Sequence, residues 1–181
     1  MDRTDEQIAL SVQQGDTESF GLLVERYEEK MFRYGRRFLN DRDDIADLVQ
    51  SLFIKAYTNI QSYDAGRRFS PWLYRIAHNT FVNELRSRRT DILKVDLDVL
   101  FPQPAASDTA DAGALDQEMK IALDTCLDQL NPKYREPIVL HYLQELSYEE
   151  VSDILRIPVT TVGVRLHRGR KLLRDAYEQH E

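Results

Sequence analysis

The sequence predicts an all-α protein made of two small helical domains that are joined by a flexible acidic linker. Apolar residues recur at helical spacing along most of the 181 residues, no segment alternates as a strand would, and only seven residues are glycine. Residues 94–115 interrupt this pattern, because they contain Pro, Ala, Ser, Asp and Gly with few apolar residues. We therefore expect an N-terminal domain over residues 1–93 and a C-terminal domain over residues 116–181.

The charge distribution indicates two separate contacts with nucleic acid, although the net charge is −7. Residues 65–90 carry six arginines and one acid, and residues 156–174 carry six basic residues and no acid. Residues 95–119 carry six acids and no base. A single cysteine fits a reducing cytoplasm, and no apolar run approaches the roughly 18 residues of a membrane-spanning helix. The start of the chain does not resemble a signal peptide, so we expect a cytoplasmic protein without membrane insertion.

Two helices are expected before residue 40. A short helix covers about Asp5–Gln14, and Asp16 is a suitable N-cap for a longer one that continues to about Leu39. The longer helix has an apolar stripe at offsets of three and four residues. Its members are Phe20, Leu23, Val24, Tyr27, Met31, Tyr34 and Phe38.

The next helix follows Asp41 and combines an apolar stripe with an acidic outer face. The stripe is Ile45, Leu48, Val49, Leu52, Ala56, Tyr57 and Ile60. The outer face is Asp43, Asp44, Asp47, Gln50, Ser51 and Lys55. This face could be a solvated surface, a partner-binding surface, or a magnesium or catalytic carboxylate cluster. The third interpretation is the weakest, because no histidine or second carboxylate pair converges on these acids.

A polar loop with two arginines, QSYDAGRRF over residues 61–69, precedes another helix that Ser70 and Pro71 should open as N-cap and N1. Its expected buried side is Trp72, Leu73, Ile76, Ala77, Thr80, Phe81 and Leu85. Its polar stripe is Arg75, Asn79, Asn83 and Arg86. Asparagine both donates and accepts hydrogen bonds, which suits the reading of base edges, with a purely structural role as the alternative.

The C-terminal domain contains a candidate helix-turn-helix. Helical periodicity resumes over Asp116–Leu130, where Cys126 shares an apolar face with leucines and is expected in the core. Asn131-Pro132 should cap a helix that runs through Tyr142, and the S-x-x-E box of Ser147 and Glu150 should open the next. Pro158 can open the last helix, in which Val159, Val162, Leu166, Gly169 and Leu173 should face inward. Two short helices whose second member is strongly basic are typical of DNA-reading proteins.

These segments together resemble the extracytoplasmic-function sigma factors of bacterial RNA polymerase. The likeness rests on DLVQSLFIKAY, FSPWLYRIAHNTFVNELRSRR, the acidic linker and LNPKYREPIVLHYLQELSYEEVSDILRIPVTTVGVRLHRGRKLL, which follow the family's order over about Asp5–Tyr177. The resemblance implies a subunit that binds core RNA polymerase, recognises −35 and −10 promoter elements and helps to melt the latter. It implies no enzymatic activity, no cofactor and no metal. The implied partners are core polymerase, duplex and single-stranded promoter DNA, and an anti-sigma factor, which in this family is commonly membrane-bound.

The resemblance also implies roles for individual residues. Contacts with the largest polymerase subunits are expected at Asp44, Asp47, Gln50 and Ser51, although the family usually has an acid where Ser51 stands. The unpaired −10 strand is expected to contact Tyr63, Arg67, Arg68, Phe69, Arg75, Asn79, Asn83 and Arg86. The −35 duplex is expected to contact Thr160, Thr161, Arg165, Arg168, Arg170 and Lys171. Trp72 and Tyr74 could stack on bases, but Trp72 at this place in an amphipathic helix is more typical of a core residue.

Three positions depart from the family pattern. Gly163 stands where a basic residue is common, Val164 replaces a small polar residue, and both changes should alter promoter preference. Arg156 replaces the usual glycine of the turn, where a positive φ should cost about 1 kcal/mol. The linker is expected to pass the polymerase active centre, with an inert spacer as the alternative.

Two other functions compete with this interpretation. A helix-turn-helix regulator that acts without polymerase explains residues 146–174 but not the acidic face, the arginine loop or the linker. A metal-dependent nucleic-acid enzyme would use Asp41, Asp43, Asp44 and Asp47, and a nuclease assay with and without magnesium distinguishes it.

Overall fold

The computed structural model describes residues 3–89 and 114–178, with the backbone alone for Arg89 and residues 114–121. Over these residues the chain forms helices and turns and no strand, which confirms the predicted all-α class. The chain divides into two compact units, unit 1 (Met1–Lys94) and unit 2 (Val95–Glu181). The predicted acidic linker lies almost wholly outside the described residues.

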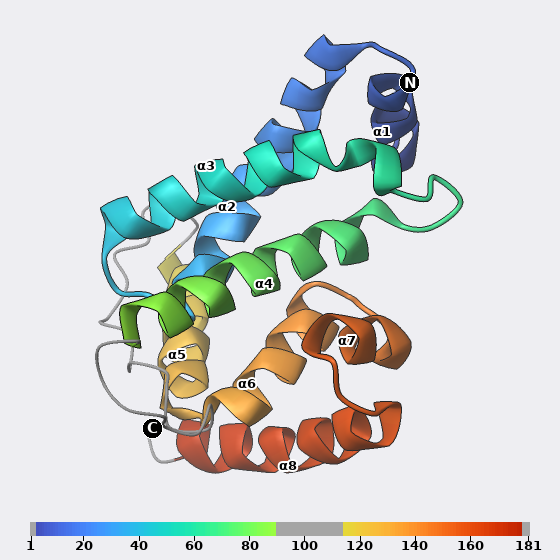
Figure 1. Ribbon diagram of the computed structural model, residues 1–181. Coiled ribbons are helices and arrows are strands. Elements are labelled where there is room, and N and C mark those ends of the chain that lie inside the picture. The colour runs from blue at the N-terminus through green and yellow to red at the C-terminus, as the bar shows by residue number, and fades with distance from the viewer. Residues whose placement is uncertain (1–2, 90–113, 179–181) are drawn as a thin grey trace. The chain divides into compact units, whose positions relative to one another are not determined.

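Unit 1 contains four α-helices and two short 3₁₀ turns over its described residues. They are α1 (Asp5–Gln13), η1 (Thr17–Ser19), α2 (Phe20–Gly35), α3 (Arg42–Thr58), η2 (Ile60–Ser62) and α4 (Phe69–Arg89). Helices α2, α3 and α4 pack against one another, and α1 lies at the end of the unit where the chain turns from α3 into α4 (Figure 1). This arrangement brings residues near positions 6 and 13 next to the arginine loop.

The core of unit 1 is largely aromatic. Phe38 stacks on Phe81 with ring centroids 5.4 Å apart, and Tyr34 meets Tyr74 edge to face at 5.3 Å. A Cβ atom on Gly35 would lie 2.6 Å from the Phe81 ring, so α2 needs glycine there to approach α4. The predicted stripes account for most of this core.

In unit 1, the burial of Tyr74, Tyr57 and Phe53 differs from the sequence expectation. Tyr74 is fully buried, which excludes it from stacking on bases. Tyr57, expected to face inward, is 40% exposed, whereas Phe53, which was not assigned to the stripe, is buried. Both differences arise at the edge of α3, where helical spacing alone does not tell which flanking residue a neighbouring helix covers.

Three helix boundaries in unit 1 also shift. The Asp16 carboxylate accepts from the Ser19 backbone N–H at 3.3 Å, so the expected cap exists, but it opens the 3₁₀ turn η1 ahead of α2. Helix α2 ends at Gly35 and not near Leu39. The prediction that Ser70 is the N-cap of the next helix is wrong, because α4 already begins at Phe69.

Unit 2 contains four α-helices over its described residues, with a turn of π-helix after the second. They are α5 (Ala114–Gln129), α6 (Pro132–Ile138), η4 (Val139–Leu143), α7 (Tyr148–Leu155) and α8 (Val159–Glu178). Asn131 caps α6 as expected, with its side chain accepting from the Lys133 N–H at 3.1 Å. The helix does not run regularly to Tyr142 as predicted, because Pro137 lacks an N–H and the chain widens into η4 directly afterwards.

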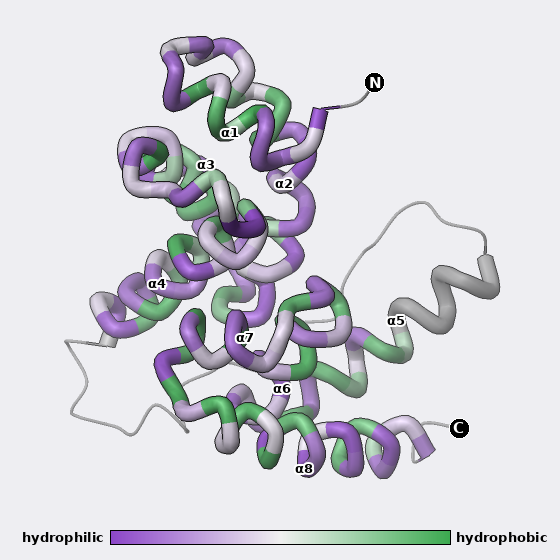
Figure 2. Tube along the Cα trace, turned by 90° about the vertical axis from the view of Figure 1, so that its right-hand side faces the viewer, coloured by the Kyte–Doolittle hydropathy of each residue, from purple (hydrophilic) through white to green (hydrophobic). Residues whose placement is uncertain are grey.

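Helix α8 packs against α5, α6 and α7 through one apolar side, visible as green positions along a mainly hydrophilic tube (Figure 2). Val162 and Leu166 are fully buried there, and Cys126 and Leu127 of α5 are in the same core. Of the residues expected to face inward, Val159 is 39% exposed, because it lies in the first turn of α8, beyond the packed side. None of the described helices is long and apolar enough to span a membrane.

Candidate nucleic-acid interface

The turn between α7 and α8 has the geometry that the sequence predicts. The Glu150 N–H donates to Ser147 Oγ at 3.2 Å, and the Ser147 N–H donates to Glu150 Oε2 at 2.8 Å. Helix α7 ends at Leu155, and its C-cap Arg156 has a φ of 55° and a ψ of 45°, the left-handed conformation expected at this position. The Pro158 carbonyl accepts from the N–H of Thr161 at 2.8 Å, so Pro158 lies just before α8. These contacts fix the direction in which α8 leaves the turn.

One side of α8 carries most of the residues assigned to the −35 duplex. Thr160, Arg168 and Lys171 are exposed, and Thr161 and Arg165 are half-buried. A helix turns about 100° per residue, so these five positions lie within one face opposite the buried Val162 and Leu166. Arg170 is also exposed but lies on another flank of α8. Val164, 51% exposed, adds an apolar patch to the same face.

Two charged residues beneath α8 were not identified from the sequence. Arg135 is 1% exposed, and its Nη1 atom lies 3.6 Å from Asp128 Oδ1. Burial raises the pKa of the neighbouring Glu136 carboxyl to about 8, even though the charges of Arg135 and Arg165 act in the opposite direction. The available signal was spacing: Arg135 precedes Ile138 by three residues and Glu136 precedes Leu140 by four, which places both on the apolar side of α6.

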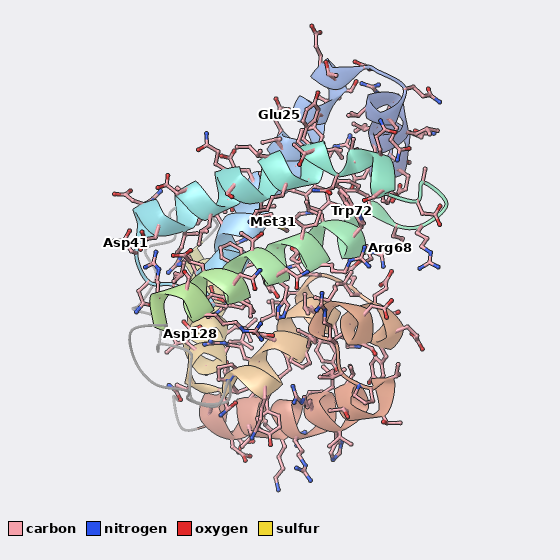
Figure 3. The ribbon with its side chains drawn as sticks, viewed as in Figure 1. Glu25, Met31, Asp41, Arg68, Trp72 and Asp128 are labelled. Carbon is pink, nitrogen blue, oxygen red and sulfur yellow. The ribbon has the colours of Figure 1, made fainter. Side chains whose placement is uncertain are left out.

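The arginine loop between η2 and α4 is a closed turn. The Arg67 N–H donates to the Asp64 carbonyl at 3.0 Å, and the Gly66 N–H donates to Asp64 Oδ1 at 2.9 Å. Arg67 and Arg68 are exposed, and Figure 3 shows Arg68 at the outer edge of unit 1. The loop therefore presents two cations from a fixed backbone.

The aromatic residues that flank this loop face the core. Tyr63 is 4% exposed and Phe69 is fully buried, so the structure does not support the prediction that their side chains contact the −10 strand. Their rings pack with Trp72, at centroid distances of 5.4 Å from Tyr63 and 5.5 Å from Phe69. Trp72 is itself 9% exposed, in line with the core interpretation. The three rings form an aromatic cluster that supports the loop from the core side. The sequence alone could not reveal that these rings are in contact, because loop residues separate Tyr63 from the other two.

The polar stripe of α4 is accessible along its length. Arg75, Asn83 and Arg86 are exposed, and Asn79 is half-buried. Their spacing of four, four and three residues keeps them on one side of the helix. Near its end, Arg88 bonds Asp44 of α3 at 2.7 Å and Glu84 at 2.7 Å.

The acidic face of α3 borders a groove between α2 and α3. Asp47 and Gln50 are exposed and line it together with Glu28 and with apolar residues, among them Phe20, Val24, Phe32, Phe53, Ile54 and Tyr57. Asp44 points to Arg88, whose hydrogen bond holds the pKa of that carboxyl below its usual range, and Ser51 is half-buried. Among residues 3–88 and 122–178, no cluster of three or more His, Cys, Asp or Glu could hold a metal ion.

Comparisons with known proteins agree with this organisation. The family model described as Sigma-70 region 2 matches residues 23–90, and the model described as Sigma-70, region 4 matches residues 120–173. The ECF RNA polymerase sigma factor SigW of Bacillus subtilis is 37% identical over 171 residues, which cover 90% of this chain and 91% of that protein. The ECF RNA polymerase sigma-E factor of Haemophilus influenzae is 37% identical over 180 residues, which cover 95% and 94%.

Solved structures show the same fold. The sigma factor RpoE of Bartonella quintana, in complex with the anti-sigma factor NepR, matches with a TM-score of 0.73 at 25% identity over 89% of this chain and 98% of that one. CnrH, in complex with the cytosolic domain of CnrY, matches with a TM-score of 0.70 at 24% identity over 98% and 99%. The chain belongs to the extracytoplasmic-function sigma factors of the sigma-70 family, the subunits that direct RNA polymerase to promoters.

Proposed function

We propose that this sigma factor divides promoter recognition between its two units. Unit 2 reads the −35 duplex with α8, and unit 1 captures the unpaired −10 strand with the arginine loop and the polar stripe of α4. The acidic face of α3 binds core polymerase. The observation that carries the proposal is the exposed cationic face of α8, in a basic segment of six Lys or Arg residues without an acid.

Reading by α8 combines phosphate contacts with base contacts. Arg165 and Arg168 lie on the same face as the threonines of the first turn. A helix placed in the major groove would therefore bring guanidinium and hydroxyl groups to the base edges. Arg168→Ala should weaken binding to −35 duplexes and lower the salt slope by about one, because one phosphate or base contact is lost. Arg174→Ala is the matched control, since Arg174 is exposed but lies on α8 beyond the last residue assigned to the duplex. An unchanged affinity for Arg168→Ala would remove this residue from the reading face.

Capture of the −10 strand needs cations for phosphates and amides for base edges. Arg67 and Arg68 supply the first, and Asn79 and Asn83 supply the second. Binding of displaced bases then offsets the unpairing cost of a few kcal/mol per base. Asn83→Ala and Arg67→Ala should each weaken binding of a single-stranded −10 oligonucleotide, whereas Arg33→Ala, an exposed change on α2, should not.

The polymerase contact is assigned to Asp47 and Gln50 beside the apolar groove. Asp47→Arg should reduce affinity for core polymerase, because the charge of an exposed rim residue is reversed. The control Glu29→Arg on α2 reverses another exposed acid, which does not line the groove. If both variants bind core polymerase as the wild type does, the acidic face is only a solvated surface.

The protein acts as a binding subunit in the cytoplasm and carries out no covalent step itself. Control by an anti-sigma factor is supported by the RpoE relative, whose solved structure is a complex with the anti-sigma factor NepR. Run-off transcription with core enzyme over genomic fragments tests the whole proposal and identifies the promoter sequence. If no genomic promoter is used while the free protein binds an operator tightly, the protein is instead a helix-turn-helix regulator that acts alone.

A further inference from the structure

Helix α1 holds both ends of the arginine loop, and we propose that Gln13 and Glu6 are positioning residues for capture of the −10 strand. The inference rests on the proposed role of the loop in that capture. Neither side chain lies on the polar stripe of α4, and neither was a candidate from the sequence. Their effect would act through the loop backbone.

Gln13 fixes the chain where it enters the loop. Its Nε2 atom donates to the Ile60 carbonyl at 2.7 Å and to the Tyr63 carbonyl at 2.8 Å. In return, Gln61 Nε2 donates to the Gln13 carbonyl at 3.0 Å. One amide group thus uses both of its N–H bonds on two carbonyls that a single turn brings together.

Glu6 fixes the chain where it leaves the loop. The Phe69 N–H, the first of α4, donates to Glu6 Oε1 at 3.1 Å. The first amides of a helix have no acceptor within the helix, so this carboxylate accepts from an N–H that α4 itself cannot satisfy. Its negative charge also lies at the positive end of the α4 dipole.

Helix α1 is itself anchored to the core of unit 1. Asp5 Oδ1 accepts from Arg26 Nη1 at 2.7 Å, and Asp5 Oδ2 accepts from the Tyr27 hydroxyl at 2.6 Å. Ile8 and Ala9 are fully buried. The residues that hold the loop therefore belong to a fixed helix, so the loop ends are fixed relative to α4.

The physical consequence is preorganisation. A loop whose ends and turn are already held loses less conformational entropy when a strand binds, so more of the contact energy remains as affinity. Discrimination between bases should also depend on this, because a loosened loop can adapt to the wrong base. The contacts of Gln13 and Glu6 with the loop backbone would then affect both the affinity for the −10 strand and the preference for one base at the captured position.

Gln13→Met tests the entrance contact, because it removes both donors while it keeps an unbranched side chain of similar size. Gln14→Met is the matched control at the neighbouring, exposed position. The probes are single-stranded oligonucleotides of the −10 element that run-off transcription identifies, with the preferred or another base at the captured position, bound to holoenzyme. Gln13→Met should lower the affinity for the preferred strand about 3- to 10-fold, because one or two hydrogen bonds are lost. It should also reduce the ratio of the affinities for the oligonucleotides with the preferred and with the other base.

Further measurements separate positioning from simple loss of folding. Amide exchange should become faster over residues 60–69 in Gln13→Met, while affinity for −35 duplex and for core polymerase stays at the wild-type level. Glu6→Met should act like Gln13→Met, and Glu6→Gln should restore most of the affinity, because its amide oxygen can still accept from the Phe69 N–H.

The outcomes distinguish the inference from the function on which it rests. The inference alone would be overturned if Gln13→Met and Glu6→Met keep the wild-type affinity for the strand and the wild-type ratio of affinities for the two bases, while Arg67→Ala binds the strand more weakly. Unchanged binding in Arg67→Ala and Asn83→Ala would overturn the proposed role of the loop. Loss of all three binding activities in both methionine variants would show that α1 is merely structural, and would also overturn the positioning role.

Discussion

The two glycines of α8 should respond differently to alanine. A Cβ atom at Gly163 would lie 3.6 Å from Tyr148 Cε2, which is an ordinary contact. At Gly169 it would lie 2.7 Å from Ile138 Cδ1 and 3.3 Å from both the Cβ atom and the carbonyl oxygen of Tyr134. Gly163→Ala should therefore stabilise unit 2, and Gly169→Ala should destabilise it or leave it unchanged.

The magnitudes follow from two opposing contributions. Either substitution gains about 1 kcal/mol, because alanine forms helix better than glycine in a helix interior. At position 169 the end of Ile138 can rotate away, but the Tyr134 backbone of α6 cannot, so overpacking costs roughly 1–3 kcal/mol. The free energy of unfolding of the two variants should consequently differ by about 1–3 kcal/mol.

Native-state hydrogen exchange of the full chain measures this difference where it arises. Protection of amides in α6 and α8 reports on unit 2, and amides of α2–α4 in unit 1 provide the reference within the same sample. Each factor of ten in protection corresponds to about 1.4 kcal/mol. Equal protection of α8 in both variants would contradict the close packing of α6 against Gly169.

Three further predictions concern single side chains. Arg156→Gly should be more stable than Arg156→Ala by about 1 kcal/mol in urea denaturation, because only glycine adopts the left-handed conformation of this turn without strain; a more stable alanine variant would contradict this. The pKa of Glu136 is raised to about 8 in the folded protein, so the folded chain binds this proton more tightly than the unfolded chain does. The contribution of protonated Glu136 to stability is therefore complete below about pH 4.5 and is lost as the pH rises through 8. The loss in the free energy of unfolding should reach roughly 3 kcal/mol at about pH 7, and urea denaturation of Glu136→Gln should not show it. A parallel loss in both proteins would rule out this role of Glu136. Arg88→Ala should raise the pKa of Asp44 in an NMR titration while it leaves the stability of unit 1 nearly unchanged, since the pair is exposed; an unshifted titration would mean that Arg88 does not bond Asp44 in solution.

Local features of the fold could be predicted from the sequence. The capping box of Ser147 and Glu150 and the cap at Asn131 involve residues two or three positions apart, so their chemistry is visible in the chain itself. The left-handed Arg156 was expected from the resemblance, because the family usually has glycine at this position of the turn. The exposure of the cationic face of α8 followed from helical spacing against Val162 and Leu166.

The errors arose where distant segments decide the local structure. Helix α4 begins at Phe69 because Glu6, 63 positions earlier, accepts from its N–H, and no local pattern encodes that bond. Tyr63 is buried because it packs on Trp72 beyond the loop, although a tyrosine next to two arginines is equally typical of a strand-binding residue. The widening at η4 depends on how the chain continues after Pro137, which propensity alone does not determine.

The rings beneath the arginine loop also give the protein an intrinsic optical signal. Trp72 is the sole tryptophan of the chain, and it is nearly enclosed by unit 1 with Tyr63 and Phe69 as immediate neighbours. Indole emission depends on the polarity around the ring, so any displacement of these two neighbours admits water and shifts the spectrum. Whether the loop moves when it binds a single-stranded −10 oligonucleotide should therefore be measurable in the unlabelled protein, by stopped-flow fluorescence with the DNA as the added component.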